Sequence, residues 1–483
     1  MNKSLSELSS IRQLPALDFE KFALNILQLE AEARGKELYK DISGTQFLKQ
    51  FFHLEGEYRL GFDAIAPFGI DDSASTFIEV KKTSRLVSEA IEQIQQVVSR
   101  YENFIKMNEV ATLDGRRTKL LLVISGGKIV KQSFLKGNED STIEIWSIDD
   151  LVEKARLYPL EYNAFLELLI SHSYGNETIN SVKEELIYVS EEDFDAQNLR
   201  LINELNKCFG KNRVSLVLGT GVSMDYNDKL SWNALSDRLY DNLDSGKKFA
   251  DPKNSISILG GDNISAVQYS KRNLGLRYST ILYNLIYPKK NAYIVGSSSL
   301  DECAELVMRN NREKKGIGKI ITYNYDNFLE QALKTRGCSF HVLYRPIDFL
   351  TDTIPIYHVH GYMPEGSRYA ERLEYIKNII LSEEDYFNWY GDPSNWNVAI
   401  QLETFKDDVC LFVGNSISDF NEKRLLNKTK QEKWKSHFAI FETRGLDFSD
   451  LAKIYMHFYY VLNVKIIWAK SVSDIPRVIK NIG

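Results

Sequence analysis

The stretch VSLVLGTGVS, residues 214–223, joins a short apolar run to a glycine turn. The run Val214–Leu218 is bounded on both sides, which is typical of a central parallel strand covered on both faces. Gly219 and Gly221 have no Cβ, so the backbone can turn tightly there and approach a pyrophosphate closely. A helix-like pattern follows from Trp232 to Leu243, and its first amides would face such phosphates. On its own, the turn is equally consistent with any α/β domain.

A second segment, YNYD at residues 323–326, follows the predicted strand Lys319–Thr322. Asn324 and Asp326 are two residues apart, so both side chains can point into the crevice beyond the carboxyl edge of a parallel sheet. A carboxamide and a carboxylate at that edge can hold a ribose hydroxyl and position a water molecule. These two residues therefore shift the interpretation from a plain strand turn to a binding site.

A histidine follows a third predicted strand, Ile354–Val359, and Gly361 behind it allows the chain to turn away. The imidazole of His360 can accept a proton near neutral pH, from a ribose hydroxyl or from attacking water. A lone histidine is more often structural, but His360 is predicted to lie on a strand neighbouring Asn324. His358 on the same strand is interpreted as structural or supporting. A fourth strand and turn, LFVGNS at residues 411–416, completes the set.

These segments resemble the sirtuin superfamily, and most closely its bacterial branch that hydrolyses NAD. The resemblance covers roughly the last three-fifths of the chain. It is carried by GTGVS at 219–223, SW at 231–232, YNYDN at 323–327, HVHG at 358–361, LSEEDY at 381–386 and GNSISD at 414–419.

The resemblance implies a Rossmann-like fold in which Asn324 and His360 carry catalysis and Asp326 supports Asn324. It also implies that NAD is the substrate and that a set of small residues lines it. These residues are Gly219, Thr220, Gly221, Ser223, Gly414 and Ser416. Relatives with this architecture are associated with bacterial anti-phage defence, in which NAD depletion halts the infected cell. By the same analogy, a homo-oligomer and an ATPase partner are expected.

Two departures from the deacetylating sirtuins inform the choice within the superfamily. Those enzymes usually carry two Cys-x-x-Cys pairs that bind zinc, whereas the 4 cysteines here are scattered without paired spacing. The usual proline before the aromatic residue of the loop is also missing, since Leu230 and Ser231 precede Trp232. We therefore expect no zinc and no peptide deacetylation, while the glycosidic chemistry is retained.

The front of the chain predicts a separate α/β unit with helix 19–31, strands 58–66 and 76–82, helix 88–101, and strands 119–125 and 143–146. This order of elements resembles the Mrr-type branch of the PD-(D/E)xK nuclease superfamily. Asp63 on one strand, with Glu79 and Lys81 on one face of the next, could surround a single point. The two carboxylates would hold Mg²⁺, and the lysine would stabilise charge on a phosphate of bound DNA. Glu-x-Lys is also common by chance, so the triplet alone favours an ordinary half-buried strand.

Length and composition describe a multidomain globular protein. The chain has 483 residues, is 43% hydrophobic and carries a net charge of −6, which does not predict indiscriminate nucleic-acid binding. Residues 1–7 lack the apolar core of a signal peptide, and unpaired cysteines fit a reducing interior, so a cytoplasmic location without membrane contact is expected. The predicted domains are a nuclease-like unit at 1–172, a linker at 173–193 and a sirtuin-like unit at 194–483, with a helical module at 236–318.

The favoured function is therefore hydrolysis of the nicotinamide–ribose bond of NAD. One alternative is a Mg²⁺-dependent DNA endonuclease whose sirtuin-like part senses a nucleotide. Another is a non-enzymatic adaptor that binds NAD or ADP-ribose. Transfer of ADP-ribose to protein would use the same bond cleavage with a different acceptor.

Overall fold

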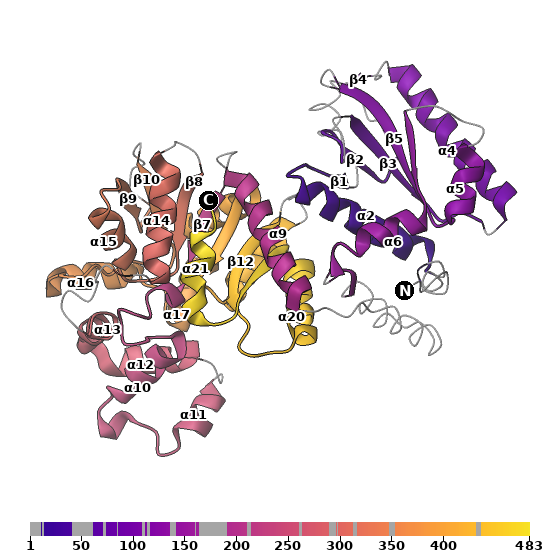
Figure 1. Cartoon of the computed structure of the whole chain (residues 1–483). Helices are drawn as coiled ribbons and strands as arrows, with labels where there is room; N and C mark the ends of the chain where they lie inside the picture. Colours follow the sequence, from indigo (N-terminus) through magenta and orange to yellow (C-terminus); the bar gives the residue numbers. More distant parts are fainter. Residues whose placement is uncertain are drawn as a thin grey trace. The chain divides into compact units, whose positions relative to one another are not determined.

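In the computed structural model, the chain divides into two compact units (Figure 1). The first comprises Met1–Glu204 with Asp447–Met456, and the second comprises Leu205–Leu446 with His457–Gly483. The division falls inside two helices, α9 (Glu191–Phe209) and α20 (Phe448–Leu462). The structure describes residues 11, 14–40, 61–70, 74–84, 86–108, 112–113, 116–135, 142–159, 161–163, 191–209, 214–259, 263–288, 296, 298–312, 316–346, 353–430 and 436–483. The predicted linker at 173–193 lies outside these residues, apart from the start of α9.

The second unit is built on a seven-stranded sheet with the strand order β13-β12-β11-β7-β8-β10-β9. Every neighbouring pair in this sheet is parallel, which confirms the predicted parallel α/β architecture for this part of the chain. The strands are β7 (Val214–Leu218), β8 (Ile317–Thr322), β9 (Phe340–Leu343), β10 (Ile354–His358), β11 (Val409–Val413), β12 (His437–Glu442) and β13 (Val464–Ala469).

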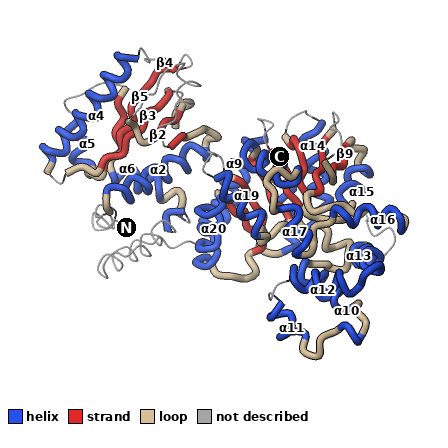
Figure 2. Tube along the Cα trace, turned by 180° about the vertical axis from the view of Figure 1, so that it is seen from behind, coloured by secondary structure: helices blue, strands red, loops and turns tan. Residues whose placement is uncertain are grey.

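Helices cover both faces of this sheet, as the full burial of β7, β11 and β13 requires (Figure 2). One face packs against α17 (Glu383–Tyr390), α18 (Trp396–Asp407) and α19 (Phe420–Lys430). The helices α14 (Ser299–Arg312), α15 (Phe328–Thr335) and α21 (Ile475–Lys480) pack together and contact β8 and β12.

The order of strands places a topological switch at β7. After β7 the chain adds β8, β9 and β10 on one side, and then returns to add β11, β12 and β13 on the other. The carboxyl ends of β7 and β11 therefore diverge into connections on opposite sides. In open parallel sheets, ligands bind in the crevice between two strand ends whose connections leave in opposite directions.

The small helical module differs from the predicted span 236–318. It comprises α10 (Trp232–Asp241), α11 (Pro252–Leu259), α12 (Asn263–Leu274) and α13 (Tyr278–Ile286), which gather at one end of the unit in both views. It is joined by α16 (Tyr369–Tyr375) and α17 from much later in the sequence, which contact α13 and α12. By contrast, α14 packs on the sheet, so the module ends before it. Local periodicity predicts helices but does not assign them to a layer.

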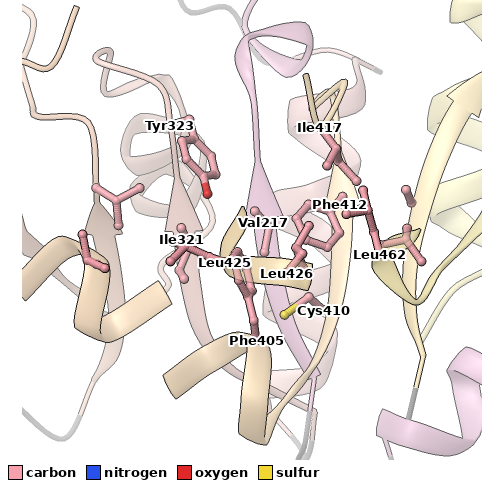
Figure 3. Close-up of a cluster of buried hydrophobic side chains, with 14 of the residues drawn as sticks. Val217, Ile321, Tyr323, Phe405, Cys410, Phe412, Ile417, Leu425, Leu426 and Leu462 are labelled. Atoms are coloured by element: carbon pink, nitrogen blue, oxygen red, sulfur yellow. The ribbon is translucent and has the colours of Figure 1, made fainter. Parts of the chain in front are cut away.

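The apolar core below the site joins the central strands to α18 and α19 (Figure 3). Val217, Ile321 and Phe412 project from β7, β8 and β11 and are fully buried. Leu425 and Leu426 of α19 pack against them, and Phe405 of α18 closes the cluster. At about 1.5–3 kcal/mol for each large apolar side chain buried, this core holds the strand ends in fixed register.

The first unit contains a mixed six-stranded sheet in which β2 and β3 are antiparallel, and β3 and β5 are parallel. Its buried cluster is rich in aromatic rings, with Phe62 and Phe77 at its centre. The strands are β1 (Tyr39–Lys40), β2 (Ala64–Ala66), β3 (Ser75–Lys81), β4 (Thr112–Leu113), β5 (Arg116–Ile124) and β6 (Ile143–Trp146). Besides its parts of α9 and α20, the described residues of this unit form the helices α2 (Ala16–Ala33), α4 (Val87–Asn108), α5 (Lys128–Leu135) and α6 (Ile148–Ala155).

Among the described residues, none of the helices combines the length and the apolar character needed to cross a membrane.

Candidate functional site

Asn324 lies two residues beyond the end of β8 and is 4% exposed. Its backbone N–H donates to Thr322 Oγ1 at 3.1 Å, and its carbonyl oxygen contacts His358 Nδ1 at 2.9 Å. These two bonds fix its backbone at the carboxyl edge of the sheet. The side chain is thereby held at the place where the sequence predicted a binding group.

Ser223 sets the orientation of the Asn324 carboxamide. The Ser223 hydroxyl donates to Asp326 Oδ1 at 3.1 Å and accepts from Asn324 Nδ2 at 3.0 Å. The other amide atom, Oδ1, is buried and has no hydrogen-bond partner within the described part of the chain. Buried polar atoms are nearly always paired, so this oxygen is ready to accept a hydrogen bond from a ligand or a water.

Asp326 is buried, and burial raises the pKa of its carboxyl to about 6. The backbone N–H of Phe328 and the Ser223 hydroxyl both donate to Oδ1, at 3.1 Å each, and oppose that increase. The side chain thus links β8 to the start of α15. It supports Asn324 through Ser223 rather than by direct contact.

His360 ends the segment that follows β10 and is 6% exposed. Burial lowers the pKa of the imidazole to about 4, so the ring is neutral at pH 7. Nε2 lies 2.9 Å from the Tyr390 hydroxyl, and the ring sits edge-on to Tyr323 with centroids 4.8 Å apart. Gly361 has φ +101°, and a Cβ there would lie 2.5 Å from the Asn378 carbonyl oxygen. In a neutral imidazole, one ring nitrogen carries a lone pair that can accept a proton.

His358 has a supporting position. Its Nδ1 contacts the Asn324 carbonyl, and its Nε2 lies 2.5 Å from Glu330 Oε1 on α15. The imidazole is 1% exposed. This bridge from α15 to the Asn324 backbone fits the structural role predicted from the sequence.

The two glycine turns predicted to line the dinucleotide pack directly against each other. A Cβ at Gly219 would lie 2.6 Å from Asn415 Cα, and one at Gly221 would lie 2.7 Å from Gly414 Cα. Gly414 itself has φ +63° and would clash with the Val222 nitrogen at 2.5 Å. Glycine is therefore required at these positions so that the turns at the ends of β7 and β11 can pack against each other.

The backbone amides of the first turn are largely engaged. Gly219 donates to the Val413 carbonyl at 3.1 Å, and Gly221 donates to Gly414 at 2.8 Å. A one-turn 3₁₀ helix at Thr220–Val222 follows, and α10 starts only at Trp232, so no α-helix N-terminus directly follows the turn. Thr220 is partly exposed and Ser416 is exposed, which leaves their side chains accessible.

Sequence reasoning missed a buried polar group on the α17 and α18 side of His360. Gln401 of α18 accepts from Tyr323 at 2.6 Å and donates to the Tyr390 hydroxyl at 3.2 Å. Tyr386 donates to Asp419 at 2.7 Å, at the start of α19. Tyr386 and Tyr390 are four residues apart, so they share a face of α17. That spacing was the available signal, but tyrosines at helical spacing are usually core residues.

Glu422 is a second missed group, fully enclosed on α19. It accepts from Asn415 Nδ2 at 2.7 Å, directly behind the second glycine turn. Burial first, and then the charge of Asp419, raise the pKa of its carboxyl to about 8. A mostly protonated Glu422 therefore fixes Asn415 at neutral pH without adding a full negative charge to the site.

The helical module is attached to α17 by a row of polar contacts. Ser265 contacts Glu383 at 2.6 Å, Gln268 donates to Glu384 at 3.5 Å, and Lys271 pairs with Asp385 at 2.6 Å. The three residues on α12 are three apart in sequence, so they lie along one face. The module is thus joined to the same helix that carries Tyr386 and Tyr390.

In the first unit, Asp63, Glu79 and Lys81 are close enough for their charges to interact. Asp63 lies just before β2 rather than within it, and its Oδ2 accepts the Val80 N–H at 2.7 Å. Burial raises the pKa of both carboxyls, and for Glu79 the charge of Asp63 adds to it. The sequence prediction that these three residues surround one region is therefore consistent with their placement.

A built-in cation already neutralises this region. Arg100 of α4 lies 2.6 Å from Glu79 Oε1 in an ion pair that the sequence did not suggest. Among the described residues, no group of three or more His, Cys, Asp or Glu side chains is arranged to hold a metal ion. The second carboxylate oxygen, Glu79 Oε2, is buried and has no hydrogen-bond partner among the described residues.

Comparisons with known proteins agree with the fold of the second unit. Residues 318–459 match the family model described as the SIR2-like domain. This range runs from β8 into α20 and includes Asn324, Asp326 and His360, so this part of the chain is similar to that family. The first glycine turn lies outside the matched range and is brought to the site by the sheet.

A curated relative supports the same class. The chain is similar to Defense-associated sirtuin 2 of Bacillus subtilis, with 24% identity over 292 residues. The alignment covers 58% of this chain and 25% of the relative. The chain therefore spans about a quarter of the relative's length, and what the whole relative does is not transferred with the likeness.

Proposed function

We propose that this protein hydrolyses NAD to nicotinamide and ADP-ribose at the edge of the seven-stranded sheet. The observation that carries the proposal is the buried Asn324 Oδ1, which has no hydrogen-bond partner among the described residues and whose side chain is held by Ser223, and through it by Asp326, at the carboxyl edge of the sheet. The neutral His360 lies two residues beyond the end of β10, the strand that pairs with β8. The SIR2-like match and the defence-associated relative favour NAD as the substrate.

The chemistry follows from the groups present. Cleavage of the nicotinamide–ribose bond leaves its electron pair on nicotinamide and develops positive charge on the ribose, as in other glycosyl transfers. Asn324 Oδ1 accepts a hydrogen bond from the attacking water and aligns it. The water oxygen bonds to the anomeric carbon, and His360 takes the proton that the water loses. Exclusion of other water by the surrounding tyrosines limits side reactions.

The biological role that fits this activity is anti-phage defence by NAD depletion. The name of the Bacillus subtilis relative supports it. We further propose that the protein acts in the cytoplasm as a homo-oligomer, kept silent until infection, with an ATPase as a possible partner. The first unit would then serve as a sensor, an assembly surface or a second effector.

The deciding experiment follows NAD in cells that express the wild type, Asn324→Ala or His360→Ala, with and without phage challenge. Chromatography of the extracts should show NAD loss with accumulation of nicotinamide and ADP-ribose in the wild type only. His457→Ala, at an exposed position on α20, is the matched control and should behave as wild type. Full NAD loss in both site variants, with normal protein levels, would remove this assignment.

The same material separates the competing functions. Plasmid cutting with Mg²⁺ that Asp63→Ala abolishes, together with unchanged NAD, would favour an endonuclease with a nucleotide-sensing domain. Tight binding of NAD without turnover in every assembly state would favour an adaptor. Mass spectrometry showing ADP-ribose on protein would identify transfer rather than hydrolysis.

A further inference from the structure

The imidazole of His360 has its Nε2 atom within hydrogen-bond distance of a buried hydroxyl. Tyr390 Oη lies 2.9 Å from Nε2, and both side chains are almost fully buried. Either atom of this pair could be the donor. Which one donates decides whether the ring proton sits on Nε2 or on Nδ1, and therefore which nitrogen can accept a proton.

Gln401 resolves that choice, because its own orientation is fixed by a backbone group. One of its amide atoms lies 2.7 Å from the Asn397 carbonyl oxygen, which can only accept, so that atom is Nε2. The other atom, Oε1, then accepts from the Tyr323 hydroxyl at 2.6 Å. Gln401 therefore faces Tyr390 with its N–H, at 3.2 Å.

The Tyr390 oxygen thus accepts from Gln401, and its own proton is left to donate. Within the described part of the chain, His360 Nε2 is the only acceptor in reach of that hydroxyl. The reverse arrangement, with Nε2–H donating to Tyr390, would leave a buried hydroxyl proton without a partner, which is unfavourable. The hydrogen-bond chain from Tyr323 through Gln401 to Tyr390 therefore runs in one direction toward His360.

We propose that Tyr390 is a positioning residue that, oriented by Gln401, holds His360 with Nε2 as the acceptor and the ring proton on Nδ1. This inference rests on the proposed NAD hydrolysis for its catalytic meaning, but the tautomer is a property of the protein alone. Nε2 is then the basic nitrogen of the ring, and its lone pair faces the Tyr390 hydroxyl. The same hydrogen bond favours the neutral ring, because protonation of Nε2 would leave the Tyr390 hydroxyl proton without a partner among the described residues.

Tyr386 provides a matched control for this role. It lies one turn before Tyr390 on α17, and its ring also packs edge-on to His360, with centroids 5.8 Å apart compared with 5.9 Å for Tyr390. Its hydroxyl donates to Asp419 instead of His360. Tyr390→Phe and Tyr386→Phe therefore remove the same atom from similar rings, and only the first touches the imidazole nitrogen.

The test is ¹⁵N NMR of the full chain labelled at histidine, with the His360 signals identified by their absence in His360→Ala. The wild type and Tyr386→Phe should show Nε2 unprotonated and Nδ1 protonated at pH 7. Tyr390→Phe should move the ring proton to Nε2, because the hydroxyl that donates to Nε2 in the wild type is then absent. A wild-type ring protonated on Nε2, or an unchanged tautomer in a folded Tyr390→Phe, would overturn the inference.

Kinetics then test the catalytic meaning. In the NAD cleavage assay, Tyr390→Phe should lower kcat about 10- to 100-fold and change KM less than about threefold, since the ring that packs in the site remains. A tautomer shift with unchanged kcat would show that Tyr390 does not position His360 for reaction. If no variant and no wild type cleaves NAD, the proposed function fails, while the NMR result still decides the tautomer.

Discussion

At the scale of single residues, Asp326 determines which atom of Asn324 is left without a partner. An ionised Asp326 can only accept, so the Ser223 hydroxyl must donate to it and accept from the Asn324 amide nitrogen. A protonated Asp326 can donate instead. Ser223 would then be free to donate to Asn324, and the carboxamide would turn its nitrogen toward the site. The protonation state of one carboxyl thus selects an acceptor or a donor at the sheet edge.

The pH dependence of NAD cleavage follows from this. Because the pKa of Asp326 is about 6, kcat/KM should fall as pH decreases through about 6. His360, with a pKa of about 4, stays neutral in that range, so its protonation does not cause the decrease in kcat/KM near pH 6. Steady-state rates between pH 4.5 and 8 would check it. A flat profile down to pH 5 would contradict the role given to Asp326.

Asp326→Asn is the control variant for the pH dependence attributed to Asp326. The folded-state pKa lies above the ordinary carboxyl value of 3.8, so ionisation between about pH 4 and 6 lowers the stability of the folded state. This increase in the pKa of Asp326 lowers the free energy of unfolding by about 3 kcal/mol at neutral pH. Asp326→Asn should therefore raise the melting temperature at pH 7.5, but not at pH 4.5, while cleavage is lost at both.

At the scale of elements, the site depends on two turns that touch. The turn after β7 and the turn after β11 come from segments almost 200 residues apart, and parallel pairing of the two strands brings them together. Their contact leaves no room for a Cβ at Gly219, Gly221 or Gly414. Glycine is required at these positions by the neighbouring backbone, whether or not a phosphate is bound.

Gly414→Ala tests the contact between the turns. The new Cβ meets the Val222 nitrogen at 2.5 Å in a backbone with φ +63°, so we expect a loss of about 2–4 kcal/mol in the free energy of unfolding. Gly445→Ala is the matched control, since φ is +72° but nothing lies within 4 Å, and it should lose only about 1 kcal/mol. Urea denaturation measures both. Equal losses would show that only backbone strain matters.

At the scale of the whole molecule, the two candidate sites lie in separate compact units. Asn324 and His360 belong to the second unit, while Asp63 and Glu79 belong to the first. Each unit has its own sheet and its own apolar core. The chemistry of one site therefore need not depend on the side chains of the other.

Glu79→Gln tests this independence in the full chain. The variant keeps the size of the side chain but weakens the ion pair with Arg100, which is 2.6 Å long in the wild type. NAD cleavage should stay within about twofold of wild type, while His360→Ala abolishes it. Loss of NAD cleavage in a folded Glu79→Gln would show that the first unit controls the second.

Much of the fold and part of the site were predictable from local patterns. Short apolar runs ending in polar residues or glycine predicted β7, β8, β10 and β11, and the structure confirms them. Amphipathic spacing likewise predicted α2 and α4. These features depend on neighbours in sequence, since strand and helix periodicities are set by the backbone itself. The residues that end the strands were found for the same reason.

The sequence by itself determined which side chains stand at the strand ends, because that depends on the order of residues along the chain. Only the tertiary structure decided what surrounds them. Tyr390 reaches His360, and Gln401 reaches Tyr390, because α17 and α18 pack on that face of the sheet; Arg100 reaches Glu79 from α4. Such contacts depend on strand order and helix packing, which residues distant in sequence settle together.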